Sequence, residues 1–211
     1  MFELGHVNKM AFVLESMKLF MLLLGGRPKT RNTEQHDIFF GIGHTVKDLV
    51  PGVKAFWPEA AANLHIDAWR EVNCVDGYTV SVEKLNPGKG IDQRAKRSSN
   101  LFFLNLGGYK ANELEEFHYK ILVVADGPEQ AKTQARATAF YKHTGLAAEQ
   151  PGTHRAEAHI DDKYGVDIDD IHAVQDILPV AVKQQYWLQL QKIETCLADL
   201  LHLGYFRLQD L

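Results

Sequence analysis

The sequence predicts an α+β protein built from two tandem ββαββ units, with mainly antiparallel sheet and a pseudo-two-fold relation between the units. Three observations lead to this prediction. An apolar run that ends in Gly-Gly occurs twice, strand-like alternation follows it, and a helical pattern separates the pairs of strands. The 211 residues, 45% hydrophobic and 24% charged, are typical of a folded chain with one large or two small domains.

The repeat is the first of these observations. Gly25-Gly26 closes the run "LFMLLLGG", and Gly107-Gly108 closes the run "LFFLNLGG" 82 residues later. Other matches keep the same order with growing offsets: Phe56-Trp57 with Phe140-Tyr141, "HID" at 65–67 with "HID" at 159–161, and "YTVSVEK" at 78–84 with "YWLQLQK" at 186–192. Matches in a conserved order predict an internal duplication with insertions in the second copy.

The elements of each unit follow from local patterns. The first strand is the apolar run, and the second is "HDIFFGIG" or "YKILVVAD", both rich in β-branched and aromatic residues. Pro128 and Gly145 bound a helix in the second unit. Pro51 and Gly52 interrupt the corresponding segment of the first unit, which predicts a shorter or broken helix there.

The last two strands are clearest in the first unit. Asp76-Gly77 predicts a hairpin turn between them. Alternation before this turn predicts two opposite faces: Leu64, Ile66, Ala68, Val72 and Cys74 on one, and His65, Asp67, Trp69 and Glu71 on the other.

These patterns predict five segments. They are an N-terminal extension over 1–16, with Met17 as a plausible start of the protein, repeat unit 1 over 17–84, a linker over 85–99, repeat unit 2 over 100–192, and a C-terminal helix and closing segment over 193–211. Within the last segment, a helical stripe runs from Ile193 to Leu201, Gly204 ends it, and "YFRL" predicts a closing strand.

The motifs resemble those of a bacterial family catalogued as a domain of unknown function, number 1543. The resemblance rests on "MKLFMLLLGG", "EQHDIFFGIG", the hairpin "HIDAWREVNCVDGY" and the duplication, which is typical of a two-copy member. The second copy departs from the pattern, because "HIDDKYGVDIDDIHAV" lacks the tryptophan and the Asp-Gly turn. The resemblance implies no activity, cofactor or partner.

Composition narrows the classes of partner. The net charge of −4 provides no basic surface for nucleic acid, and no segment has the length of a membrane span. Cys74 and Cys196 are too few for a disulfide framework; we expect small buried thiols in a reducing compartment and hence a cytoplasmic protein. The partner is an unknown small molecule or protein, and the sequence leaves the oligomeric state open.

Two polar pairs are the candidate site. Glu34 and His36 share one face of a predicted strand, and His65 and Asp67 share one face of another. The second copy offers the same residue types in the same order: Glu116, His118, His159 and Asp161. Imidazole with carboxylate is a ligand set for zinc or manganese and also an acid–base pair near neutral pH. The same pairs can instead cap turns or hold two hairpins together.

Two functions of different classes remain open. The first is a non-catalytic binding or assembly module that uses the cleft or the edge strands between its units. The alternative is a metal-assisted, phosphoesterase-like hydrolase, in which the histidines and aspartates bind the metal and Glu34 or Glu116 acts as the base. A divalent metal is the cofactor only in the alternative function.

Overall fold

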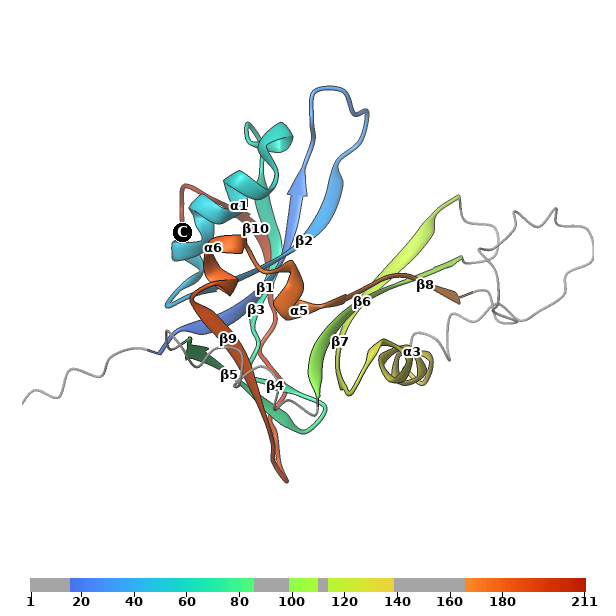
Figure 1. The fold of residues 1–211 in the computed structure, drawn as a ribbon. Coiled ribbons are helices and arrows are strands. Elements are labelled where there is room, and N and C mark those ends of the chain that lie inside the picture. Colours follow the sequence, from blue (N-terminus) through green and yellow to red (C-terminus); the bar gives the residue numbers. More distant parts are fainter. Residues whose placement is uncertain (1–15, 86–98, 110–113, 139–165) are drawn as a thin grey trace, which may run out of the picture.

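The computed structural model describes residues 16–85, 99–109, 114–138 and 166–211. In this part of the chain the fold is α+β, and every pair of strands is antiparallel (Figure 1). This confirms the predicted class and the mainly antiparallel sheet.

The strands are β1 (Lys18–Gly26), β2 (Gln35–Gly43), β3 (His65–Glu71), β4 (Cys74–Val75), β5 (Tyr78–Lys84), β6 (Asn100–Tyr109), β7 (Glu116–Ala125), β8 (Val166–Ala173), β9 (Tyr186–Lys192) and β10 (His202–Arg207). The helices are α1 (Val50–Phe56), α3 (Pro128–Arg136), α5 (Val174–Ile177) and α6 (Val180–Lys183), with 3-10 turns at Val46–Leu49 and Pro58–Ala60.

The strands form three sheets. Sheet A has the order β10-β3-β1-β2, sheet B has the order β4-β5-β9, and sheet C has the order β7-β6-β8. β5 and β9, which carry the matching motifs "YTVSVEK" and "YWLQLQK", pair with each other, so that Tyr78 lies opposite Lys192 and Lys84 opposite Tyr186. Sheet B therefore joins the part of the chain that forms sheet A to the part that forms sheet C.

A central hydrophobic core lies between the inner faces of sheets A and C. Phe40 on β2 and Phe103 on β6 meet edge to face, with ring centroids 5.7 Å apart. Leu19 on β1 and Leu188 on β9 belong to the same cluster of buried residues. The two sheets converge at this core and diverge toward the β1–β2 and β6–β7 hairpins (Figure 1).

Sheets A and C each have a helix on the outer face, away from the central core. Val53 of α1 packs in the cluster that includes Leu22 and Leu24 of β1. Ala131 and Ala135 of α3 pack in the cluster that covers the outer face of sheet C. Both helices were predicted. α3 begins at Pro128 as expected and ends at Arg136, while Gly145 lies outside the described residues.

The first helix is broken as predicted. A 3-10 turn precedes α1, Pro51 occupies the first turn of α1, and a second 3-10 turn follows. Proline is tolerated in a first helical turn because the N–H that it lacks would have no partner there.

A β-bulge in β3 corrects the predicted alternation. The register of β3 on β1 shifts between Leu23 and Leu24, and Asp67 is the extra residue. Ile66 and Trp69 consequently pack in the same hydrophobic cluster, although strict alternation placed them on opposite faces. The Asp76-Gly77 hairpin is confirmed; both residues have positive φ.

The predicted C-terminal helix is wrong. Residues 193–201 contain no helix, and the chain continues as β10, which pairs with β3 and includes most of the predicted closing strand. Asp199 attaches this segment to the strands of the first half of the chain. Its Oδ1 accepts hydrogen bonds from the backbone N–H groups of Asn73 and Cys74. Burial raises the pKa of the Asp199 carboxyl, and those hydrogen bonds and nearby Arg70 oppose the rise.

Large apolar side chains of the C-terminal segment are exposed: Leu197, Leu200, Leu201, Leu203 and Tyr205.

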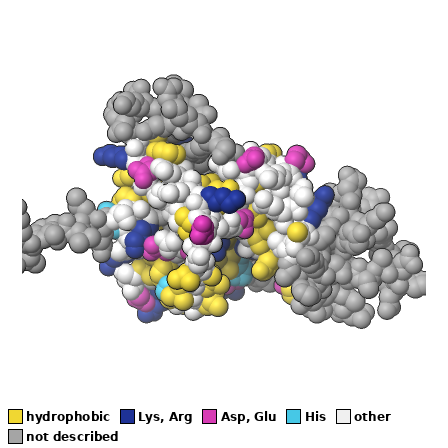
Figure 2. Space-filling view, turned by 90° about the horizontal axis from the view of Figure 1, so that it is seen from below, with side chains coloured by type: hydrophobic (Ala, Val, Ile, Leu, Met, Phe, Trp, Pro, Cys, Tyr) yellow, Lys and Arg dark blue, Asp and Glu magenta, His cyan; other side chains and the backbone are white. Residues whose placement is uncertain are grey.

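Seen from below, the surface has hydrophobic patches with charges of both signs scattered between them (Figure 2). Among the described residues, no helix combines the length and the apolar composition needed to cross a membrane.

The two cysteines form a disulfide, which corrects the prediction of free thiols. Cys74 and Cys196 are 122 residues apart in the sequence, and their Cα atoms are 6.0 Å apart. The sequence does not give the distance in space between the two cysteines, and a disulfide requires Cα atoms within about 7 Å. Disulfides persist mainly in oxidising compartments, so the cysteines no longer support the prediction of a cytoplasmic location.

We expect Cys74→Ser to lower the free energy of unfolding by about 2–4 kcal/mol, because the disulfide restricts the unfolded chain. Urea unfolding without reductant measures the loss. Dithiothreitol should lower the stability of the wild type by a similar amount and leave that of the variant unchanged. Two titratable thiols in the native, unreduced wild type would contradict the pairing.

Candidate functional site

The first cluster of polar side chains is built around a glycine. Gly25 lies near the end of β1, opposite His36 on β2 and opposite His65 on β3. Residues that face each other across neighbouring strands point to the same side of the sheet. A Cβ atom at Gly25 would collide with His65 Nε2 and Asp67 Oδ2. The missing side chain therefore provides the space in which the neighbouring side chains meet.

His65 is held in one orientation. Its side chain is 3% exposed, and Nδ1 lies 2.8 Å from the backbone oxygen of Asn63. Since a carbonyl oxygen can only accept, Nδ1 carries the proton and Nε2 keeps a free lone pair in the neutral ring. The ring of Tyr205 on β10 covers the imidazole, with centroids 4.2 Å apart.

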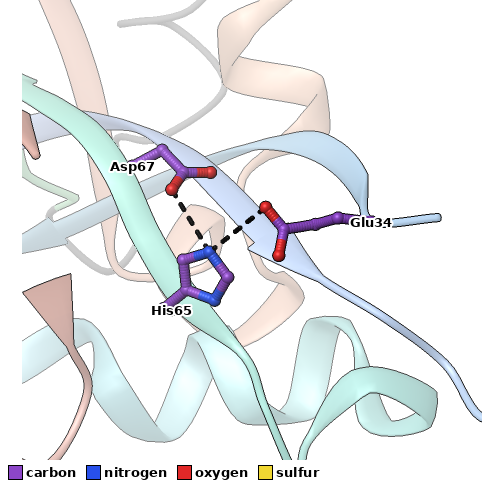
Figure 3. A group of neighbouring side chains, drawn as sticks. All are labelled: Glu34, His65 and Asp67. Carbon is purple, nitrogen blue, oxygen red and sulfur yellow. Dashed lines mark ion pairs between the residues drawn. The ribbon is translucent and has the colours of Figure 1, made fainter. Parts of the chain in front are cut away.

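Two carboxylates approach His65 Nε2 (Figure 3). Asp67 Oδ1 lies 3.2 Å away, and Glu34 Oε1, from the chain just before β2, lies 3.6 Å away. Neither distance is accompanied by hydrogen-bond geometry, and His65 Nε2 and Asp67 Oδ2 are buried without a hydrogen-bond partner among the described residues. Asp67 lies two residues after His65 on β3, so that alternation places both side chains on the same side of the sheet, as predicted.

His36 joins this group from β2. Its Nε2 lies 3.3 Å from Asp67 Oδ2 and 3.4 Å from Glu34 Oε1, and its side chain is 47% exposed. We call Glu34, His36, His65 and Asp67 cluster 1. Two imidazoles and two carboxylates are a ligand set for a divalent transition metal.

A second cluster lies on sheet C. His118 on β7 is opposite Gly107 on β6; its Nε2 lies 3.2 Å from Asp169 Oδ2 and 3.9 Å from Glu116 Oε2. A Cβ atom at Gly107 would lie 2.5 Å from Asp169 Oδ2 and 2.9 Å from Glu116 Oε1. We call Glu116, His118 and Asp169 cluster 2. Its three side chains are 28–38% exposed, whereas the side chain of His65 in cluster 1 is 3% exposed. Solvent therefore reaches cluster 2 more easily than it reaches His65.

The prediction from the sequence did not include Asp169. It predicted His159 and Asp161 as the partners of Glu116 and His118, and both lie outside the described residues. The strand beside Gly107 is β8, which has its own bulge at Asp169. The tripeptide "DID" at 167–169 was the available signal, because it copies "HID" at 65–67 in all but its first residue.

Both clusters contribute to the lining of one cleft between sheets A and C, with a volume of about 660 Å³. Glu34 and His36 line one wall, and Glu116 and His118 line the other. Lys120 on β7 also lines it; burial lowers the pKa of the Lys120 ammonium, and the charges of Asp37 and Asp169 oppose that shift. The remaining lining residues are Leu23, Gln35, Asp37, Ile38, Phe103, Asn105, Glu115, Phe117 and Asp170.

Comparison with known proteins finds one family model. Residues 31–82 match the model described as Domain of Unknown Function (DUF1543), which confirms the resemblance indicated by the motifs. The matched segment contains all of cluster 1.

A solved structure shares the fold. The crystal structure of a protein Il1583 from Idiomarina loihiensis superposes with a TM-score of 0.56 and 22% sequence identity, over 90% of this chain and 97% of that chain. None of the curated proteins matches the chain.

We expect His65→Ala to lower the free energy of unfolding of metal-free protein by about 1–3 kcal/mol, because the variant loses a buried side chain and its hydrogen bond to Asn63. His118→Ala is the matched control: its side chain is 38% exposed, and we expect a change within about 0.5 kcal/mol. Urea unfolding in the presence of a chelator measures both. Equal losses would show that His65 is no more structural than His118.

Proposed function

We propose that the protein is a binding module whose ligand site is the cleft between sheets A and C, and that the ligand is cationic. Charge is the observation that carries this proposal. The cleft is lined by five carboxylates and one ammonium: Glu34, Asp37, Glu115, Glu116 and Asp170 against Lys120. A cleft lined by one sign of charge concentrates ligands of the opposite sign. A metal ion, an organic diamine or a basic side chain fits this charge, whereas a free anion does not.

We further infer that the two walls come from an internal duplication and are related by a pseudo-two-fold axis. The pairing of β5 with β9 supports this, because Ser81 lies opposite Gln189 at the centre of the two matching motifs. The registers also support it, since Gly25 and Gly107 both face a histidine on the next strand. Each unit would then provide one polar cluster to the shared cleft.

The charge argument predicts the choice of ligand. We expect 1,4-diaminobutane and divalent cations to shift the backbone amide resonances of cleft residues such as Gln35 and Phe117, and inorganic phosphate alone to leave them unchanged. Glu116→Gln should weaken diamine binding roughly 5-fold, since a near-surface ion pair contributes up to about 1 kcal/mol.

Glu129→Gln is the matched control for this experiment, because Glu129 lies on α3 outside the cleft lining and its side chain is 84% exposed. Its affinity should equal that of the wild type. Phosphate shifts at the cleft resonances, or equal weakening by both variants, would contradict a cation-binding cleft.

A metal-assisted hydrolase is the second candidate, and the position of Glu34 favours it. This carboxylate borders both histidines of cluster 1 and lines the cleft, where it could accept a proton from a water molecule. In this candidate His36, His65 and Asp67 hold the metal, and Glu34 is the base and not a ligand. If the protein hydrolyses a chromogenic phosphodiester with added Mn²⁺ or Zn²⁺, Glu34→Gln should lower kcat at least about 100-fold. Glu59→Gln, on the 3-10 turn at Pro58–Ala60, is the control. Absence of turnover with either metal would leave binding as the function.

A further inference from the structure

The geometry points to a binding site for one divalent transition-metal ion of the zinc type at cluster 1. This inference rests on the proposed function, because it names the cation and the place in the cleft where the cation binds. The ligands assigned are Glu34, His65 and Asp67, whose donor atoms all lie within 4.8 Å of one another, together with His36 from the neighbouring strand.

The state of His65 is the first argument. Buried polar atoms are almost always hydrogen-bonded, yet His65 Nε2 has no such partner among the described residues and points at two carboxylates. Its Nδ1 donates to the backbone oxygen of Asn63. Metal-binding histidines are commonly oriented this way, with one ring nitrogen donating to a carbonyl and the other free for the metal. Asp67 Oδ2 is a second buried atom that has no hydrogen bond within the described part of the chain.

The spacing of the donor atoms is the second argument. Four-coordinate zinc binds nitrogen and oxygen at about 2.0–2.1 Å, so the donor atoms of a tetrahedral site lie about 3.3 Å apart. In cluster 1, His65 Nε2 lies 3.2 Å from Asp67 Oδ1 and 3.6 Å from Glu34 Oε1. His36 Nε2 lies 3.4 Å from the same Glu34 oxygen and 3.3 Å from the other Asp67 oxygen, Oδ2. The half-exposed ring of His36 is the ligand with the most freedom to adjust.

The chemistry of the ligands is the third argument, since it selects the class of metal. Mg²⁺ and Ca²⁺ prefer oxygen ligands throughout, whereas imidazole suits zinc and its neighbours in the first transition row. Cluster 2 has a single described histidine, whose side chain is 38% exposed where that of His65 is 3% exposed, so it serves as the matched control in the same molecule.

Gly25 provides a test that leaves all four ligands in place. A Cβ atom there would fall on His65 Nε2 and Asp67 Oδ2, in the space assigned to the metal. Gly25→Ala should therefore block the metal, and Gly107→Ala, which places a Cβ among the carboxylates of cluster 2, should not.

The experiment uses the full, untagged chain after treatment with a chelator. Zn²⁺ is titrated calorimetrically, and Co²⁺ is added as a spectroscopic probe of tetrahedral coordination. We expect one tight Zn²⁺ per chain and strong visible absorption with Co²⁺. His65→Gln, His36→Gln and Gly25→Ala should each weaken Zn²⁺ at least about 10-fold. His118→Gln and Gly107→Ala should leave that affinity unchanged.

Circular dichroism checks that each variant is folded. If His65→Gln or Gly25→Ala does not fold, His36→Gln decides alone, because the His36 side chain is 47% exposed. Three results would overturn the inference: no stoichiometric Zn²⁺, Zn²⁺ binding that His36→Gln leaves intact, or binding that is lost in His118→Gln instead. The first would mean that cluster 1 does not bind the metal. Diaminobutane separates this failure from that of the proposed function, since a cleft that binds diamine without Zn²⁺ remains a cation-binding cleft.

Discussion

Packing between the inner faces of sheets A and C is the interaction on which the cleft depends. Alternation along a strand directs every second residue to the same face. On β2 this inner face passes from Ile42 and Phe40, which are buried in the central core, to Ile38 and then to His36 at the hairpin. The apolar end holds the two sheets together, and the polar end cannot be buried at low cost. One pair of faces thus produces both the core and the open site.

A glycine and strand alternation determine what the polar end can do. Gly25 on the inner strand β1 has no side chain, and a histidine lies opposite it on the strand at each side. Asp67, two residues after His65 on β3, adds a carboxylate on the same side. The result is a buried imidazole nitrogen that has no hydrogen bond among the described residues. An unsatisfied buried polar group of this kind costs about 1–3 kcal/mol.

The C-terminal segment supports the site from the edge of the sheet. Asp199 and the Cys74–Cys196 disulfide fasten it beside β4, and β10 then pairs with β3. This pairing places the ring of Tyr205 against His65. The tail is distant in sequence from cluster 1, but it packs against the least exposed side chain of that cluster.

The sequence by itself determined the α+β class, the strand pattern and the residue types of cluster 1, because strand periodicity and turn signals are local. It placed Glu34 and His36 on one face of a strand and His65 and Asp67 on one face of another. Only the tertiary structure decided that these pairs meet across β1, since strand order and register depend on contacts between distant segments. The same reason explains the errors. A bulge, a disulfide over 122 residues and a tail that pairs with β3 instead of forming a helix are all chosen by non-local packing.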